Sequence, residues 1–198
     1  MTGTPKIKKV GLFFGSFNPI HAGHMIIANY MLEFTDLDEV WFIISPHNPL
    51  KEKETLLADH HRYALVRIAT EHYPRFKASN FEFSLPQPSY TIDTLVRLEE
   101  KHPGREFVLI AGTDIFPTFH KWKNYEELLN HYHIFAYPRP GSDLGKYAGH
   151  PHIHLYPAPL MEISSSFIRD AISSGKDIRF FLSEKVFEYI REMHFYGA

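Results

Sequence analysis

The chain contains no cysteine, carries almost no net charge and has no long apolar run, and each of these absences excludes a class of protein. Without cysteine there is no disulfide framework, no thiol nucleophile and no cysteine-ligated zinc. A formal charge of -2 gives no basic field for general nucleic-acid binding, so any bound anion needs a local site. No stretch approaches the roughly 20 apolar residues of a membrane span, and no signal peptide is recognisable. We expect a cytoplasmic protein with neither nucleic-acid nor membrane partners.

Short β-rich segments alternate with segments of helical period along the whole sequence. Its 198 residues, 44% of them hydrophobic, suffice for the core of one domain covering 1–198. Periodicity predicts strands at 7–14, 39–45, 106–111, 133–137 and 153–156. It predicts helices at 26–34, 58–72, 91–98, 125–130, 166–174 and 183–194. This alternation predicts an α/β fold with a doubly wound parallel sheet and closing C-terminal helices, whose ligands bind beyond the carboxyl ends of the strands.

The segment G-S-F-N-P-I-H-A-G-H, residues 15–24, lies where the first predicted strand turns into a helix. Gly15 lets the backbone approach a ligand, and the free amides of the next helical turn attract an anion. His21 and His24 are three residues apart, so both imidazoles fall on one face of that turn. A capped helix start would also contain such residues, but the combination favours a phosphate-binding turn.

A second segment, I-S-S-S-F-I-R at 163–169, opens one of the closing helices. Serine hydroxyls cap helix starts, so Ser164, Ser165 and Ser166 are also compatible with a purely structural role. Arg169 lies one turn further along the helix and adds a positive charge.

These two segments resemble the H-x-G-H and S-S-T-x-I-R motifs of the nucleotidylyltransferase superfamily, with Ser166 in place of the threonine. The resemblance implies that ATP phosphates lie over the first turn. It implies that His24 contacts the α-phosphate and His21 the neighbouring phosphates, while Arg169 and Ser165 hold the departing pyrophosphate. Further phosphate contacts implied by the resemblance are Gly15, Ser16, Phe17, Lys51, Ser164 and Ser166.

The middle of the chain contains S-Y-T-I-D-T at 89–94, G-T-D at 112–114 and K-W at 121–122. With S-P-H-N-P-L-K at 45–51 and R-P-G at 139–141, these are similar to bacterial nicotinate-nucleotide adenylyltransferases over nearly the whole chain. That family has N-P-H-K where this sequence has N-P-L-K. The similarity implies adenylyl transfer from ATP to nicotinate mononucleotide, which yields nicotinate adenine dinucleotide for NAD biosynthesis. The nicotinate-nucleotide contacts it implies are Tyr90, Thr91, Asp93, Asp114 and Trp122.

Two other functions are compatible with parts of this pattern. Phosphopantetheine adenylyltransferases carry similar terminal motifs, but with threonine in place of His21. A non-catalytic nucleotide-binding regulator would keep the fold and lose turnover. We expect Mg²⁺ to be bound through the ATP phosphates rather than by protein ligands, and the chain to be able to form homo-oligomers.

The histidines of H-P-H-I-H, namely His150, His152 and His154, fall on one side of an extended segment. Because no carboxylate is close in sequence and the segment adjoins the loop at 141–149, which we expect to be exposed, metal binding is the disfavoured alternative here.

Overall fold

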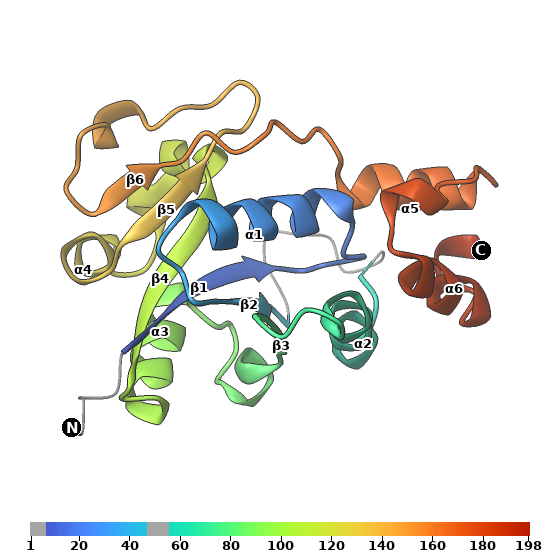
Figure 1. The fold of residues 1–198 in the computed structure, drawn as a ribbon, viewed down its shortest axis with the longest axis horizontal. Coiled ribbons are helices and arrows are strands. Elements are labelled where there is room, and N and C mark those ends of the chain that lie inside the picture. Colours follow the sequence, from blue (N-terminus) through green and yellow to red (C-terminus); the bar gives the residue numbers. More distant parts are fainter. Residues whose placement is uncertain (1–6, 47–55) are drawn as a thin grey trace.

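A computed structural model describes residues 7–46 and 56–198. In these residues six strands form one parallel sheet with the order β3-β2-β1-β4-β5-β6 (Figure 1). The strands are β1 (Lys8–Gly15), β2 (Glu39–Ile44), β3 (Phe76–Ser79), β4 (Arg105–Gly112), β5 (Ile134–Tyr137) and β6 (Ile153–Leu155). The predicted doubly wound α/β sheet is thus confirmed, with one additional strand, β3.

Helices cover both faces of the sheet. The α-helices are α1 (Ala22–Phe34), α2 (Asp59–Thr70), α3 (Thr91–Lys101), α4 (Tyr125–His131), α5 (Ser165–Ser173) and α6 (Glu184–Glu192). The short 3-10 helices are η2 (Phe81–Ser84), η3 (Thr113–Lys121), η4 (Gly145–Tyr147), η5 (Arg179–Phe181) and η6 (Phe195–Gly197). The helix α1 begins at the residue after His21, as the motif predicts, and extends the apolar pattern at 26–34 by four residues towards the N-terminus.

Two cores result from the alternation of side chains along the strands. Phe13 of β1 packs into the core beneath α1, α2, α5 and α6, whereas its neighbour Leu12 packs into the core beneath α3 and α4. The loop region before β6 is not wholly exposed as predicted, because Tyr147 of η4 is buried in the second core. The longest helix described, α1, has 13 residues, and none of the described helices could cross a bilayer.

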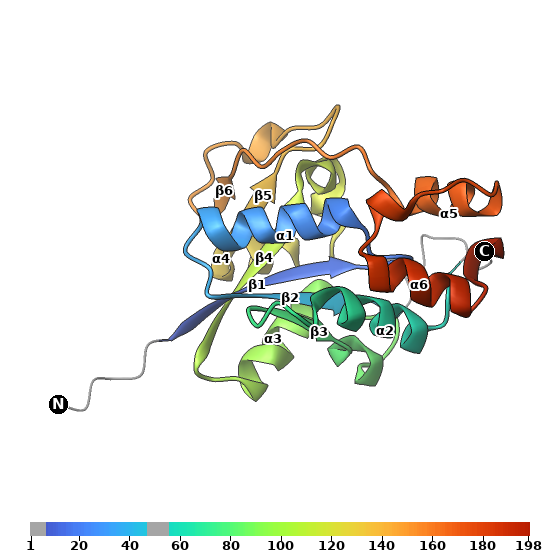
Figure 2. The same ribbon diagram turned by 45° about the vertical axis from the view of Figure 1, so that its right-hand side comes forward.

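The strand order places a topological switch point between β1 and β4. From β1 the sheet continues to β2 and β3 on one side and to β4, β5 and β6 on the other, so the connections diverge at the carboxyl ends of β1 and β4. The C-terminal helices α5 and α6 lie just beyond the carboxyl end of β1, as both views show (Figures 1 and 2). The last part of the chain therefore returns to the turn that follows its first strand.

Candidate active site

The turn after β1 is shaped by Gly15 and Phe17. A Cβ on Gly15 would come within 2.9 Å of the Phe17 ring, so the close approach requires glycine. Phe17 has a positive φ of 46° and is 1% exposed, with its ring packed 5.1 Å from that of His24. The side chain of Phe17 therefore packs in the core against the His24 ring.

The two histidines of the turn stack on each other, with ring centroids 3.7 Å apart. His21 directly precedes α1, and its backbone N–H donates to Nδ1 of His24 at 3.3 Å. Since Nδ1 accepts, the proton of a neutral His24 ring is on Nε2. His24 therefore presents Nε2–H as a hydrogen-bond donor.

His21 is 5% exposed, and its Nδ1 atom has no hydrogen-bond partner among the described residues. Buried polar atoms are nearly always hydrogen-bonded, so such an atom indicates a missing partner. Burial, assisted by the positive charge of Arg139, lowers the pKa of His21 to about 4. The ring is thus neutral at pH 7 and can offer one N–H donor without carrying a charge.

The C-terminal motif contacts this turn directly. Ser164 caps α5 by accepting from the Phe167 amide at 3.1 Å, and Ser165 donates its hydroxyl to the carbonyl of Pro19 at 2.9 Å. Arg169 donates to the Asn18 carbonyl at 2.8 Å and to the Ser166 hydroxyl at 3.2 Å. The two motifs, about 150 residues apart in sequence, are therefore joined by direct hydrogen bonds.

A cavity of about 580 Å³ lies between the two motifs. The helices α1 and α5 both begin at its wall, and each adds the partial positive charge of a helix N-terminus. The predicted residues that line it are Gly15, Ser16, Phe17, His21, His24, Asp114, Ser164, Ser165, Ser166 and Arg169. Lys51 lies outside the described residues. The size and charge of this cavity suit a nucleotide triphosphate.

Arg139 is a second arginine of the cavity, and its place there was not predicted from the sequence. Its Nη1 donates to the Met161 carbonyl at 3.2 Å, and its Nε lies 3.9 Å from a carboxylate oxygen of Asp114. A Cβ on Gly112 would overlap both Asp114 and Arg139, so glycine at the end of β4 lets these side chains lie over it. The sequence signal that could have identified Arg139 is its position shortly after a predicted strand, which is β5 in the structure.

Four of the predicted nicotinate-nucleotide residues are not in the wall of this cavity and form a group on the α3 side of the sheet. Thr91 begins α3, and Lys123 pairs with Asp93 at 2.8 Å while its Nζ lies 4.7 Å from the centre of the Tyr90 ring. Trp122 packs against Phe119, with centroids 5.2 Å apart. The helix η3, which contains Asp114 and ends just before Trp122, connects this group to the cavity.

The histidine-rich segment makes contacts of another kind. His154 Nε2 lies 3.0 Å from Nδ1 of His133, and His152 Nδ1 lies 2.6 Å from the Leu129 carbonyl. Within residues 7–46 and 56–198 no group of three or more histidine and acidic side chains is arranged to hold a metal ion. These imidazoles connect β6 to β5 and α4.

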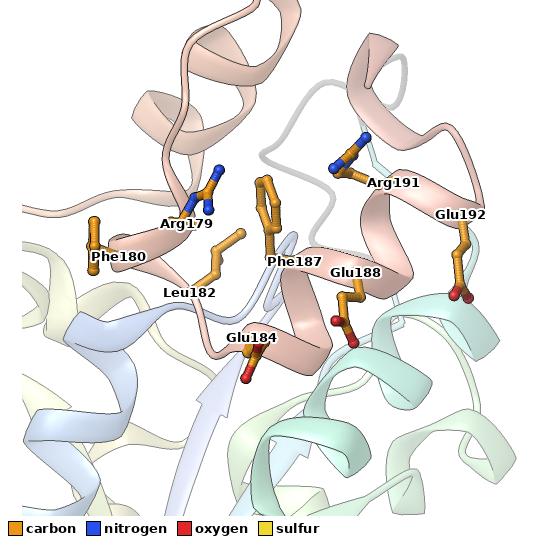
Figure 3. A pocket seen from close by; sticks show the side chains of 8 residues that line it. All are labelled: Arg179, Phe180, Leu182, Glu184, Phe187, Glu188, Arg191 and Glu192. Atoms are coloured by element: carbon orange, nitrogen blue, oxygen red, sulfur yellow. The ribbon is translucent and has the colours of Figure 1, made fainter.

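A larger cavity, of about 820 Å³, lies between η5 and α6 (Figure 3). In its wall the Phe187 ring has the guanidinium of Arg179 at 6.0 Å and that of Arg191 at 5.9 Å. Phe180 at its edge is 92% exposed. None of the predicted site residues that the structure describes lines this cavity. The candidate site is therefore the smaller cavity at the switch point.

The buried, neutral state of His21 makes the protein sensitive to acid. Because the pKa of His21 is lower in the folded state than its ordinary value near 6.5, its contribution to stability is complete above pH 6.5 and is lost as the pH falls towards 4. We expect the free energy of unfolding to fall by about 2 kcal/mol more between pH 7 and pH 5 in the wild type than in His21→Gln, whose side chain does not titrate. Urea denaturation at the two pH values measures this difference, and equal losses would contradict it.

Comparisons with known proteins show which family the chain belongs to. Residues 12–171 match the family model described as cytidylyltransferase-like. A Flavobacterium johnsoniae protein named "Probable nicotinate-nucleotide adenylyltransferase" is 52% identical over 95% of this chain and 98% of its own length. A Christiangramia forsetii protein of the same name is 51% identical over 96% and 98%. A solved Plasmodium falciparum nicotinic acid mononucleotide adenylyltransferase, complexed with NaAD, has the same fold, with a TM-score of 0.81 and 22% identity over 96% of this chain and 97% of that one. The chain therefore belongs to the nicotinate-nucleotide adenylyltransferase family, within the cytidylyltransferase-like proteins.

Proposed function

We propose that the chain transfers the adenylyl group of ATP to nicotinate mononucleotide in the cavity between its two terminal motifs. The products are nicotinate adenine dinucleotide and pyrophosphate. The observation that carries this proposal is the convergence of His21, His24 and Arg169 on one cavity, where the buried Nδ1 of His21 lacks a partner among the described residues. The identity of the acceptor is inferred from family membership, and the position of the triphosphate is inferred from the geometry of the cavity.

In this reaction a phosphate oxygen of the mononucleotide forms a bond to the α-phosphorus of ATP, while the bond to pyrophosphate breaks. A phosphate monoester is already ionised near neutral pH, so the attacking oxygen needs no base. The protein then acts by alignment and by stabilising the charge that grows on the phosphate oxygens. In our proposal His24 donates Nε2–H to the α-phosphate and His21 contacts the phosphates beside it.

The departing pyrophosphate is assigned to the start of α5. Arg169 supplies positive charge there. The Ser165 hydroxyl already donates to Pro19, so its contribution comes from the backbone amide, which lies in the first helical turn and has no partner within the helix.

The acceptor would extend from the cavity towards the start of α3. The free amides at Thr91 suit the nicotinate carboxylate, and Trp122 offers an aromatic face for the pyridine ring. Asp93 already pairs with Lys123, so it orders the start of the helix instead of offering a free carboxylate to the ligand. Asp114, which lies between the two groups, suits a ribose hydroxyl.

The nucleotide substrate in this proposal is ATP with bound Mg²⁺. Among the described residues Asp114 is the only carboxylate that lines the cavity, and no set of their side chains forms a complete metal site, so the ion fits as part of the substrate. Bound in this way, Mg²⁺ neutralises charge on the polyphosphate.

A pyrophosphate-release assay with a panel of acceptors tests the function. With ATP and Mg²⁺ we expect turnover with nicotinate mononucleotide, and none with phosphopantetheine. Nicotinamide mononucleotide in the same assay measures the preference for the acid, and EDTA is expected to abolish turnover until Mg²⁺ is restored. Turnover with phosphopantetheine alone would indicate a different adenylyltransferase. If no acceptor led to pyrophosphate release, the chain would be a non-catalytic nucleotide-binding regulator.

A further inference from the structure

A side chain of the C-terminal 3-10 helix η6, that of Tyr196, contacts the turn after β1. The hydroxyl of Tyr196 donates to Oδ1 of Asn18 at 2.8 Å, across a sequence separation of 178 residues. Tyr196 itself has a φ of 60°, in the left-handed region that non-glycine residues rarely adopt. Burial raises the pKa of the Tyr196 hydroxyl, against the opposing effect of Arg169 and Arg62. The hydroxyl therefore stays protonated and remains a donor at neutral pH.

Asn18 receives hydrogen bonds from three separate parts of the chain. Besides Tyr196, the backbone amide of Leu57 donates to its Oδ1 at 3.2 Å, and Arg169 donates to its backbone carbonyl at 2.8 Å. Asn18 is 3% exposed and is located between Phe17 and the Pro19 carbonyl that accepts from Ser165. The conformation of the phosphate turn is thus fixed by partners outside the turn.

We propose that Tyr196 is a positioning residue for adenylyl transfer, which fixes the turn through Asn18 so that His24 and Arg169 face the triphosphate from opposite sides. The inference rests on the proposed function of that turn. Alignment of catalytic groups within a fraction of an ångström governs rate, and small displacements cost up to about 100-fold. Because the hydroxyl makes one neutral hydrogen bond to a turn that has other supports, we expect its loss to cost about tenfold in kcat.

The test is Tyr196→Phe in the full chain, which removes the hydroxyl and keeps the ring. We expect kcat to fall about tenfold, while KM for ATP changes less than about twofold because most binding contacts remain. Tyr189→Phe is the matched control. The Tyr189 hydroxyl on α6 lies 3.3 Å from His61 Nδ1, a partner that is not part of the turn, so this variant should retain wild-type kcat. Equal kcat values for wild type and Tyr196→Phe would overturn the proposal.

A double-mutant cycle separates positioning from packing. Since Tyr196 acts through Asn18, Tyr196→Phe should have no further effect on kcat in an Asn18→Ala background. Effects that multiply would show that Tyr196 acts by another route and would overturn the inference. The proposed function is tested separately by His24→Ala. Full turnover in His24→Ala as well would contradict the proposed function. A lower kcat in His24→Ala with an unchanged kcat in Tyr196→Phe would contradict only the role of Tyr196.

Discussion

Replacing His24 with alanine should lower kcat by about 10²- to 10³-fold, as expected when one donor to a developing phosphate charge is removed. The ring is held by stacking on His21 and by the amide that donates to Nδ1, so Nε2–H is oriented before substrate arrives. Such preorganisation contributes mainly in the transition state, so KM for ATP should change much less than kcat. Pyrophosphate release under saturating and limiting ATP measures both constants.

The matched control is His131→Ala. His131 is exposed on α4 and pairs with Glu127 at 3.0 Å, an i,i+4 contact of little energetic value at the surface. Its loss should leave kcat at the wild-type value. Full turnover in His24→Ala would remove the central catalytic assignment, whatever the control shows.

Replacing Arg62 with methionine should destabilise the fold by about 3–5 kcal/mol. Arg62 of α2 is fully buried and donates to the carbonyls of Ser16, Ser45, Pro46 and Leu57 and to the carboxylate of Asp59. Methionine would fill similar space but would leave these acceptors without their donor. Because Ser16 belongs to the phosphate turn, kcat should fall as well.

Urea denaturation checks this expectation, with Arg67→Met as its control. Arg67 lies on the same helix but is exposed, so its replacement should change the free energy of unfolding by less than about 0.5 kcal/mol. If the two variants were equally stable, the buried guanidinium would not be what holds the segments around the phosphate turn together.

The sequence predicted the elements whose pattern is local. The strand β1 and the helix start at Thr91 could be placed because apolar runs and turn residues mark them directly. The edge strand β3 was missed because only Phe76 of its four residues is buried, so it shows no apolar run. Strand order was not predicted either, since pairing of β1 with β4 depends on contacts between residues about 100 apart.

In the candidate site, too, residues in local motifs could be predicted, whereas residues that depend on distant contacts could not. The histidines and serines could be recognised because each motif is contiguous, and the family resemblance indicated that both contact one triphosphate. Arg62 and Tyr196 have no local signal: Arg62 follows two histidines on a helix, and Tyr196 is one of several aromatic residues near the C-terminus. Their roles depend on partners in distant loops, the backbone carbonyls and the Asn18 side chain, which sequence patterns do not reveal.

The most direct test is a crystal structure of the full chain with a non-hydrolysable ATP analogue and Mg²⁺. The triphosphate should lie in the cavity at the end of β1, with its α-phosphate within hydrogen-bond distance of His24 Nε2 and its outer phosphates beside the Arg169 guanidinium. A triphosphate bound between η5 and α6, or bound at the turn without contact to Arg169, would contradict the account.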